Sequence, residues 1–503
     1  MNILLSVLLL LSCFHSALNA ATNTTAIKLT QGTIVGTQSD GLTVFKGIPY
    51  AKPPVGQYRW QPPRSPEPEE KSLLAKEFGA MCLQANFRNT PKFDISEDCL
   101  SVNVWTPHTQ AKQPVMVWIH GGGFRGGSNR IKGEVFANEG NVVVSVNYRL
   151  GPLGFFAHES LEQPVANFGL LDLELALQWV AENVHAFGGD PENVTIFGVS
   201  AGGQAINLLM TSPRARGLFH RAIAQSGYAT WPLPRSRNAA LPAPKNLYMA
   251  PANSAEEMDR KLIKSISLDD QTEAMLRAID GKRLIQAQVG FRAPIVDGSS
   301  LMEEPGILFL RGEQAKVPFI TGGASYEGSV VGAIPLTPAD IERSLNEDLE
   351  FARNLYASDP EDIWQRRLQG DMRYLFSGRT TAKAMGASPV WLYYIDFLSV
   401  SQAGEPGTAH GSDGWLIFNG ASSEDPEVRS LSSRIISYWS RFASTGNPNS
   451  GKSATWPTYD SNHKTWLIFD KFDRIGRAIN KEKLDFHERR YHERISSDTE
   501  QSR

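Results

Sequence analysis

The sequence lacks a charge excess of either sign, which excludes one broad set of partners. Its 503 residues include 50 basic and 53 acidic side chains, for a formal net charge of −3 at pH 7. A near-neutral chain has no long-range field that attracts nucleic acid or an anionic membrane, so we expect neither as a partner. Charged residues make up 20% and hydrophobic residues 41%, which excludes a disordered or collagen-like chain.

Cysteine is scarce, with three residues in the whole chain. Cys13, Cys82 and Cys99 show no Cys-x-x-Cys spacing and give no support for a zinc site, so we expect no metal. If Cys13 leaves with an N-terminal signal, one pair remains. An even count in an exported chain predicts a disulfide between Cys82 and Cys99, and the alternative is two free thiols in a cytosolic protein.

Long apolar runs are absent beyond the N-terminus, so no later segment predicts a membrane span. Residues 3–11 are almost unbroken aliphatic and small residues follow at 16–21, a pattern typical of a secretory signal peptide, residues 1–20. We therefore expect a secreted or periplasmic protein. Two alternatives stay open: an N-terminal membrane anchor, and a lipoprotein in which a lipobox-like Leu-Leu-Ser-Cys segment leaves Cys13 lipidated.

What the chain does contain is a succession of short apolar runs separated by helical patterns. The runs that predict strands lie at 100–105, 114–120, 141–147, 193–198, 317–322 and 389–395. Helical periodicity at 170–184 separates two of them, and this alternation predicts an α/β fold with a mostly parallel, twisted sheet covered by helices. We expect residues 21–503 to form one domain, in which segments near 231–290 and 338–387 are helical cap insertions.

The sharpest chemical signal is a serine between two glycines, in the segment Gly198-Val199-Ser200-Ala201-Gly202. It directly follows one predicted strand and precedes an apolar helical segment. A serine on such a tight turn projects its hydroxyl clear of the sheet, and small neighbours let the helix pack beneath it. The five-residue pattern alone is weak in a glycine-rich chain, but the strand-turn-helix context predicts that Ser200 is a nucleophile.

A run of glycines, His120-Gly121-Gly122-Gly123, follows another predicted strand. Consecutive glycines let a loop approach a substrate closely and aim its N–H groups at one point. We expect the backbone N–H groups of Gly122, Gly123 and Ala201 to form an oxyanion hole. The alternative is a plain flexible loop.

A serine nucleophile needs a base and an acid that orients it. His410 is the best candidate base, because it lies in a polar loop that follows the predicted strand at 389–395. His487 and His492 lie instead in a charged C-terminal tail, for which we expect a solvated surface helix. Glu327 fits the acid better than Asp297, because it follows a predicted central strand at the sheet edge where ligands bind, but position alone leaves both open.

Together these motifs resemble type-B carboxylesterases, the cholinesterase-like branch of the α/β-hydrolase fold. The resemblance covers nearly all of the mature chain and is carried by residues 45–54, 96–104, 120–124, 147–151, 167–172, 187–191 and 197–203. It implies a triad of Ser200, Glu327 and His410, oxyanion donors at Gly122, Gly123 and Ala201, and a Cys82–Cys99 disulfide. The resemblance thus selects Glu327 over Asp297.

Departures from the family pattern bear on the substrate. Val199 stands where family members usually carry Glu, which removes a carboxylate and disfavours cationic substrates. The first disulfide loop has no Trp, unlike that of cholinesterases, and the acyl-pocket stretch at 288–291 looks more open. Trp231 resembles the family's acyl-pocket wall. Arg125, beside the glycine loop, could face a substrate carboxylate, or be a surface or salt-bridged arginine.

The sequence therefore predicts a secreted serine carboxylesterase that acts on small-molecule esters through an acyl-enzyme, without a cofactor. One alternative is an amidase or lactonase with the same triad, because the nucleophile and oxyanion hole serve all acyl transfers. Another is a cholinesterase-like binding protein that has lost catalysis, although every catalytic position is kept here. The sequence does not specify the acyl or alcohol preference or the oligomeric state.

Overall fold

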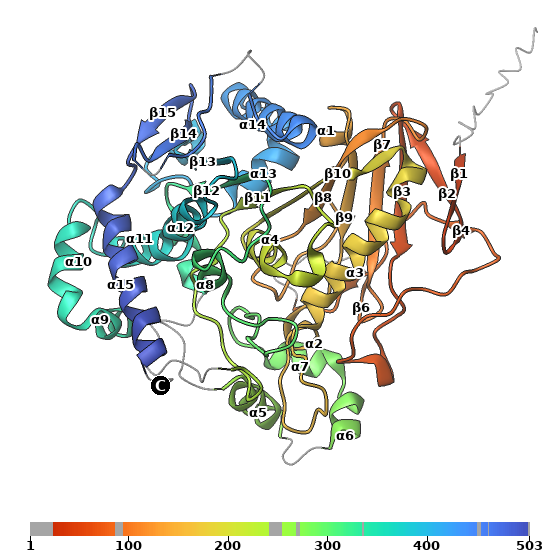
Figure 1. The fold of residues 1–503 in the computed structure, drawn as a ribbon, viewed down its shortest axis with the longest axis horizontal. Coiled ribbons are helices and arrows are strands. Elements are labelled where there is room, and N and C mark those ends of the chain that lie inside the picture. The colour runs from red at the N-terminus through yellow and green to blue at the C-terminus, as the bar shows by residue number, and fades with distance from the viewer. Residues whose placement is uncertain are drawn as a thin grey trace, which may run out of the picture.

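A large twisted sheet forms the centre of the molecule (Figure 1). The computed structural model describes residues 24–85, 94–240, 254–267, 272–333, 337–449, 454–460 and 462–500, so the predicted signal peptide lies outside the described residues. Within them, 13 strands form the sheet in the order β1 (Thr24–Leu29), β2 (Gly32–Ser39), β3 (Leu42–Pro49), β7 (Ser101–Thr106), β9 (Val142–Val146), β8 (Gln113–Ile119), β10 (Gly189–Val199), β11 (Arg221–Gln225), β12 (Phe319–Ala324), β13 (Val390–Ile395), β14 (Thr465–Phe469) and β15 (Arg474–Arg477), with β4 (Leu73–Leu74) paired to β2.

The centre of the sheet is parallel. Each neighbouring pair from β9 to β14 runs parallel, whereas β7 pairs with β9, and β14 with β15, in the antiparallel sense. The strands predicted from apolar runs all lie in this sheet, and the mostly parallel architecture is confirmed. The sequence analysis did not predict the short strands β14 and β15 at one end of the sheet, although β14 is itself an apolar run, Thr-Trp-Leu-Ile-Phe.

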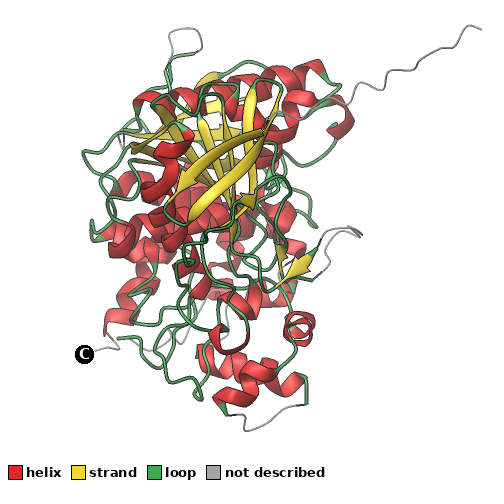
Figure 2. Cartoon of the chain, turned by 90° about the vertical axis from the view of Figure 1, so that its right-hand side faces the viewer, coloured by secondary structure: helices red, strands yellow, loops and turns green. Residues whose placement is uncertain are grey.

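Alternate residues of each central strand face two separate apolar cores. In β8, Val115, Val117 and Ile119 join the core beneath α3 (Phe168–Asn183), α4 (Ala201–Thr211) and α12 (Phe376–Ala384). Met116 and Trp118 join the opposite core, beneath α1 (Glu134–Ala137), α13 (Ser412–Asn419) and α14 (Pro426–Thr445). Figure 2 shows the strands enclosed by helices in this way. Burial on both faces explains why these strands are apolar runs rather than alternating patterns.

Two groups of helices lie between the late strands, and all of them but α8 fall in the segments interpreted above as caps. The first, between β11 and β12, contains α5 (Ala255–Ser265), α6 (Glu273–Ala278), α7 (Gly281–Ala287) and α8 (Pro305–Leu310). The second, between β12 and β13, contains α9 (Pro338–Leu345), α10 (Leu349–Leu355), α11 (Trp364–Gly370) and α12. A π-helical turn, Asp371–Leu375, joins α11 to α12. In Figure 1, α5 and α6 lie at the bottom, far from the sheet, and α9 and α10 lie beside the C-terminal helix.

The C-terminal helix, α15 (Lys481–Glu500), is more than the solvated surface helix that its charge suggests. Leu484, Phe486, His487 and Tyr491 are buried. Burial lowers the pKa of His487 to about 3, so this histidine is neutral at physiological pH. No helix in the described part of the chain combines the length and hydropathy needed to cross a bilayer.

The structure contains the predicted disulfide. Cys82 ends β5 (Met81–Cys82), which pairs with β6 (Ile95–Ser96), and its sulfur is bonded to that of Cys99, with the two Cα atoms 4.9 Å apart. Both cysteines are buried beside the main core. The bond closes a loop with a sequence separation of 17 residues.

Replacing both cysteines by serine should lower the free energy of unfolding by about 3 kcal/mol, because the unfolded chain gains the freedom of a loop of this length. Urea denaturation of the double variant and of the oxidised wild-type protein measures this difference. Wild-type protein unfolded in the presence of a reductant is the matched control, and it should show the same loss. Equal unfolding midpoints in all three samples would contradict a structural role for the bond.

Candidate active site

Ser200 occupies a strained turn between β10 and α4. Its backbone has φ 58° and ψ −119°, in a region that residues with a side chain rarely adopt. Two hydrogen bonds hold the turn: the Ser200 N–H donates to the Gln225 carbonyl at 2.8 Å, and the Ser200 carbonyl accepts from the Gln204 N–H at 2.8 Å. The side chain is partly exposed, so its hydroxyl is accessible from outside the core.

The glycines on either side of Ser200 allow α4 to pack tightly on the end of β8. A Cβ atom at Gly202 would lie 2.1 Å from the Ile119 carbonyl oxygen, and one at Gly198 would lie 2.5 Å from the same oxygen. No real side chain tolerates such contacts with backbone. The small neighbours expected from the sequence are therefore required by close packing.

The structure brings the three predicted triad residues together. His410 Nε2 lies 2.8 Å from Ser200 Oγ, and His410 Nδ1 hydrogen-bonds to Glu327 Oε2. The Glu327 side chain is completely buried, and that of His410 is 7% exposed. Each residue follows the carboxyl end of a strand of the parallel block, β10, β12 or β13, which is the edge where open sheets of this kind bind ligands.

A buried network surrounds Glu327 on the side away from His410. Its Oε1 accepts hydrogen bonds from the Ala324 N–H at 2.7 Å and the Ser226 hydroxyl at 2.6 Å. Next to Ser226, the Asp413 carboxylate accepts from the Tyr393 hydroxyl at 2.6 Å. Burial, together with the nearby Glu327 charge, raises the pKa of Asp413. The sequence analysis missed Ser226 and Asp413, although Ser226 directly follows a central strand, β11, and Asp413 lies three residues after His410.

Tyr374, in the π-helical turn, also contacts the triad. Its ring centroid lies 4.3 Å from that of His410. Burial raises the pKa of Tyr374, so the hydroxyl is protonated across the physiological range. This residue comes from an insertion with no recognisable motif, and no sequence signal identifies it.

The glycine loop lies directly beside Ser200. A Cβ atom at Gly121 would lie 3.3 Å from Ser200 Cβ, while Gly122 (φ 111°) and Gly123 (φ 63°) adopt the positive φ that favours glycine. The N–H groups of Gly122 and Gly123 have no hydrogen-bond acceptor among the described residues. Ala201 is the first residue of α4, where helix N–H groups have no partner within the helix. These three predicted donors are thus available to a ligand.

His120 holds this loop in place and is not a second base. Its ring stacks on Tyr148 with centroids 4.5 Å apart, and the Tyr148 hydroxyl donates to the His120 carbonyl at 2.9 Å. Burial lowers the pKa of His120 to about 4, which keeps the imidazole neutral. No group of three or more His, Cys, Asp or Glu side chains in the described residues is arranged to hold a metal ion.

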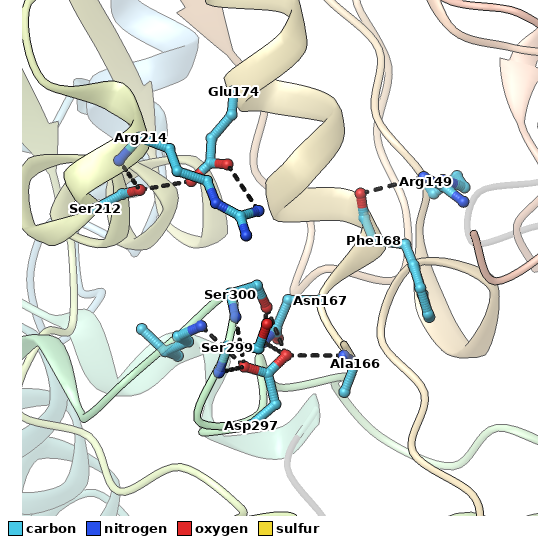
Figure 3. Close-up of polar contacts among 11 residues, drawn as sticks. Arg149, Ala166, Asn167, Phe168, Glu174, Ser212, Arg214, Asp297, Ser299 and Ser300 are labelled. Atoms are coloured by element: carbon cyan, nitrogen blue, oxygen red, sulfur yellow. Dashed lines mark hydrogen bonds and ion pairs between the residues drawn. The ribbon is translucent and has the colours of Figure 1, made fainter. Parts of the chain in front are cut away.

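Asp297, the other candidate acid, belongs to a different network (Figure 3). Its carboxylate accepts from the N–H groups of Ala166, Ser299, Ser300 and Leu301, the hydroxyl of Ser300 and the amide of Asn167, at 2.5 to 3.1 Å. These donors tie the loop at 297–301 to the segment that precedes α3. Asp297 is fully buried and plays a structural part.

The three predicted substrate-binding residues have different surroundings. Val199 packs on α13, since a Cβ atom at Gly414 would lie 2.9 Å from its Cγ1. Trp231 is 8% exposed and follows β11. Arg125 donates from Nη1 to the Gly290 carbonyl at 2.8 Å, so its guanidinium is engaged with the backbone of the loop at 288–291.

Comparisons with known proteins agree with the resemblance to carboxylesterases that the sequence motifs indicated. Residues 23–368 and 365–487 match the carboxylesterase family. The para-nitrobenzyl esterase of Bacillus subtilis (strain 168) is 36% identical over 469 residues, covering 87% of this chain and 93% of that protein. Carboxylesterase 4A of Bos taurus is 32% identical over 507 residues, covering 89% and 91%. A solved PNB esterase has a TM-score of 0.79 and 31% identity, covering 91% and 99%, which confirms the α/β-hydrolase fold.

A matched pair of carboxylate variants tests which acid serves His410. Glu327→Gln should slow covalent labelling of Ser200 by a fluorescent organophosphonate by about 100-fold or more, because an amide does not stabilise the imidazolium. Asp297→Asn should label at the wild-type rate per folded molecule. It should instead lower the free energy of unfolding by about 2 kcal/mol or more, because its amide places a donor against backbone N–H groups.

Labelling is followed by in-gel fluorescence and stability by thermal denaturation, so that each variant is corrected for its folded fraction. Slow labelling of Asp297→Asn together with wild-type labelling of Glu327→Gln would reverse the assignment.

Proposed function

The chain belongs to the carboxylesterase family and is a hydrolase of carboxylic esters, and from that premise we propose that Ser200, His410 and Glu327 carry out the reaction. One observation carries this proposal. His410 Nε2 lies 2.8 Å from Ser200 Oγ, while its other ring nitrogen hydrogen-bonds to a buried carboxylate. This arrangement of nucleophile, base and orienting acid is the one that activates a serine hydroxyl.

In the first half-reaction, His410 takes the Ser200 proton as Oγ attacks the ester carbonyl carbon. The carbonyl oxygen becomes an oxyanion and accepts hydrogen bonds from the N–H groups of Gly122, Gly123 and Ala201. One such donor typically contributes about 3 kcal/mol to lowering the barrier. The imidazolium then protonates the leaving alcohol, which departs and leaves Ser200 acylated.

In the second half-reaction, His410 deprotonates a water molecule that attacks the acyl-enzyme, and the carboxylic acid product leaves as Ser200 regains its proton. Glu327 holds the ring in the tautomer that has Nε2 free as a base, and its charge stabilises the imidazolium. Every proton transfer in this scheme uses protein side chains or water, so the proposal includes no cofactor.

The surroundings of the triad support a small, uncharged or anionic ester rather than a cationic one. Val199 places an apolar side chain beside the nucleophile, and Trp231 supplies a large apolar wall that we assign to the acyl pocket. An amide or lactone would meet the same catalytic atoms. The named relatives are esterases, which favours esters as the substrates of this chain.

Initial rates across p-nitrophenyl esters, from acetate to palmitate, test the proposal. The wild-type protein should show a maximum at short or medium acyl chains, because a walled pocket limits the acyl length. Ser200→Ala should lower kcat by about 10⁴-fold or more, since the nucleophile is removed. Ser430→Ala, an exposed serine on α14, is the matched control and should retain the wild-type rate. A folded Ser200→Ala protein that keeps the wild-type rate would overturn the assignment.

We also propose that residues 1–20 direct export and are then removed. The apolar run and the small residues around Ala20 support this, as does the Cys82–Cys99 bond, because disulfides persist in oxidising compartments. Expression in a bacterium followed by intact-mass analysis of the exported protein should show a mature chain that begins at Ala21. A cytoplasmic protein that retains residues 1–20 would refute export, and a lipid-modified Cys13 would establish the lipoprotein alternative instead.

A further inference from the structure

Arg373 is a buried arginine beside the triad for which the reaction scheme has no use. Arg373 is 6% exposed, and it lies in the π-helical turn next to Tyr374, whose ring contacts that of His410. A π-helical turn holds one residue more than the α-helical turn that it replaces, and such turns occur often at functional sites.

Aromatic rings surround the Arg373 guanidinium. Its Cζ lies 4.2 Å from the ring centroid of Trp231, 4.3 Å from Tyr228, 5.5 Å from Tyr374 and 5.7 Å from Phe291. All four distances are within the range of cation–π attraction. We call these four rings the aromatic cage. Cation–π attraction stabilises the buried positive charge of Arg373, but the rings carry no negative charge that would neutralise it.

The aromatic cage is part of the active site. Phe291 packs against the oxyanion loop, since a Cβ atom at Gly123 would lie 2.2 Å from its ring. Tyr374 contacts the ring of His410 at a centroid distance of 4.3 Å. Phe291 therefore lies between Arg373 and the oxyanion loop, and Tyr374 lies between Arg373 and His410. Trp231, the proposed acyl-pocket wall, is the ring nearest to the guanidinium.

Arg373 differs from the other deeply buried arginines, each of which is paired with a carboxylate. The pairs are Arg59 with Glu97, Arg149 with Asp172, Arg235 with Glu303, Arg292 with Asp259, and Arg379 with Asp485. Among the described residues, no carboxylate lies within 4.0 Å of the Arg373 guanidinium. Its buried Nε has no hydrogen-bond partner in the described part of the chain.

We propose that Arg373 binds a carboxylate carried by the acyl group of the substrate, so that monoesters of short dicarboxylic acids are the preferred substrate class. A buried charge and a buried unsatisfied donor are both costly, and a substrate carboxylate satisfies both at once. The planar guanidinium also matches a carboxylate in geometry. This inference rests on the proposed function, because Ser200 and Trp231 define where the acyl group lies.

We assign to Arg373 the contact with a substrate carboxylate that the sequence analysis raised as one of two alternatives for Arg125. The Arg125 guanidinium donates to the Gly290 carbonyl and supports the loop that presents Phe291, so Arg125 helps to build the aromatic cage.

Discrimination against neutral esters follows from the chemistry of Arg373. An acyl group without a carboxylate leaves the buried donor unpaired, and sites with an unpaired buried polar group reject such analogues strongly.

The test compares kcat/KM for monoethyl glutarate with kcat/KM for ethyl pentanoate, its neutral counterpart, by titration of the released acid. The wild-type enzyme should prefer the anionic ester. Arg373→Gln should lower the ratio of the two values by about 10- to 100-fold, as expected for loss of a charge-assisted hydrogen bond. Arg311→Gln removes an exposed arginine and should leave the ratio unchanged. A wild-type enzyme without the preference, or an unchanged ratio in Arg373→Gln, would overturn the inference.

Two further measurements need only the wild-type protein and so do not depend on the folding of a variant. Glutarate should inhibit hydrolysis of a neutral ester at a concentration about tenfold or more below that of pentanoate, and equal inhibition would overturn the inference. Butyryloxyacetate carries its carboxylate on the alcohol side, and a preference for it over monoethyl glutarate would refute the acyl assignment.

The outcomes also separate this inference from the proposed function. If the enzyme hydrolyses ethyl pentanoate and does not prefer monoethyl glutarate, the proposed role of Arg373 is wrong, whereas the proposed triad is unaffected. A folded enzyme that hydrolyses neither ester, and in which Ser200 resists labelling, would contradict the triad itself.

Discussion

The contact between α4 and the end of β8 is the constraint on which the rest of the site depends. The Ile119 carbonyl oxygen approaches the backbone at Gly198 and Gly202 so closely that neither position has room for a Cβ atom. This contact forces the turn between them to be tight, and the tight turn places Ser200 at positive φ with its hydroxyl raised. The glycine loop begins directly after Ile119, so the same contact also brings Gly121, Gly122 and Gly123 beside Ser200, the proposed nucleophile.

The strands and the site residues that could be predicted from the sequence all have strong local signals. The central strands are apolar because both of their faces are buried, and the turn at Ser200 needs glycines that are visible in the sequence. His410 and Glu327 could be ranked because parallel strands end at one edge, so that chain order restricts which loops meet. Glu327 and Asp297 remained hard to separate by position, since both are buried acids that follow apolar residues. Their hydrogen-bond donors distinguish them.

The residues that the sequence did not predict depend on packing between distant segments. Ser226 matters because β11 lies between β10 and β12 in the sheet, which brings its end to Glu327. Tyr374 and Arg373 lie in an insertion, and neither hydrophobic periodicity nor a motif in the sequence indicates that this insertion covers the site. The burial of α15 was missed for a related reason, because its apolar residues are few among many charges, although they meet the second insertion closely.

Under the two proposals above, the π-helical turn lets substrate specificity evolve separately from catalysis. The triad and the oxyanion loop come from strand ends whose spacing is set by the sheet, whereas Arg373 and Tyr374 owe their directions to one additional residue in a helix. Each residue of an α-helix turns the chain by about 100°, so loss of one residue upstream would rotate the downstream side chains away from the site. A single-codon deletion could therefore remove the Arg373 guanidinium from the site, and a single-codon insertion could return it. Ser200, His410 and Glu327 would stay unchanged, and no substitution would occur at Arg373 itself.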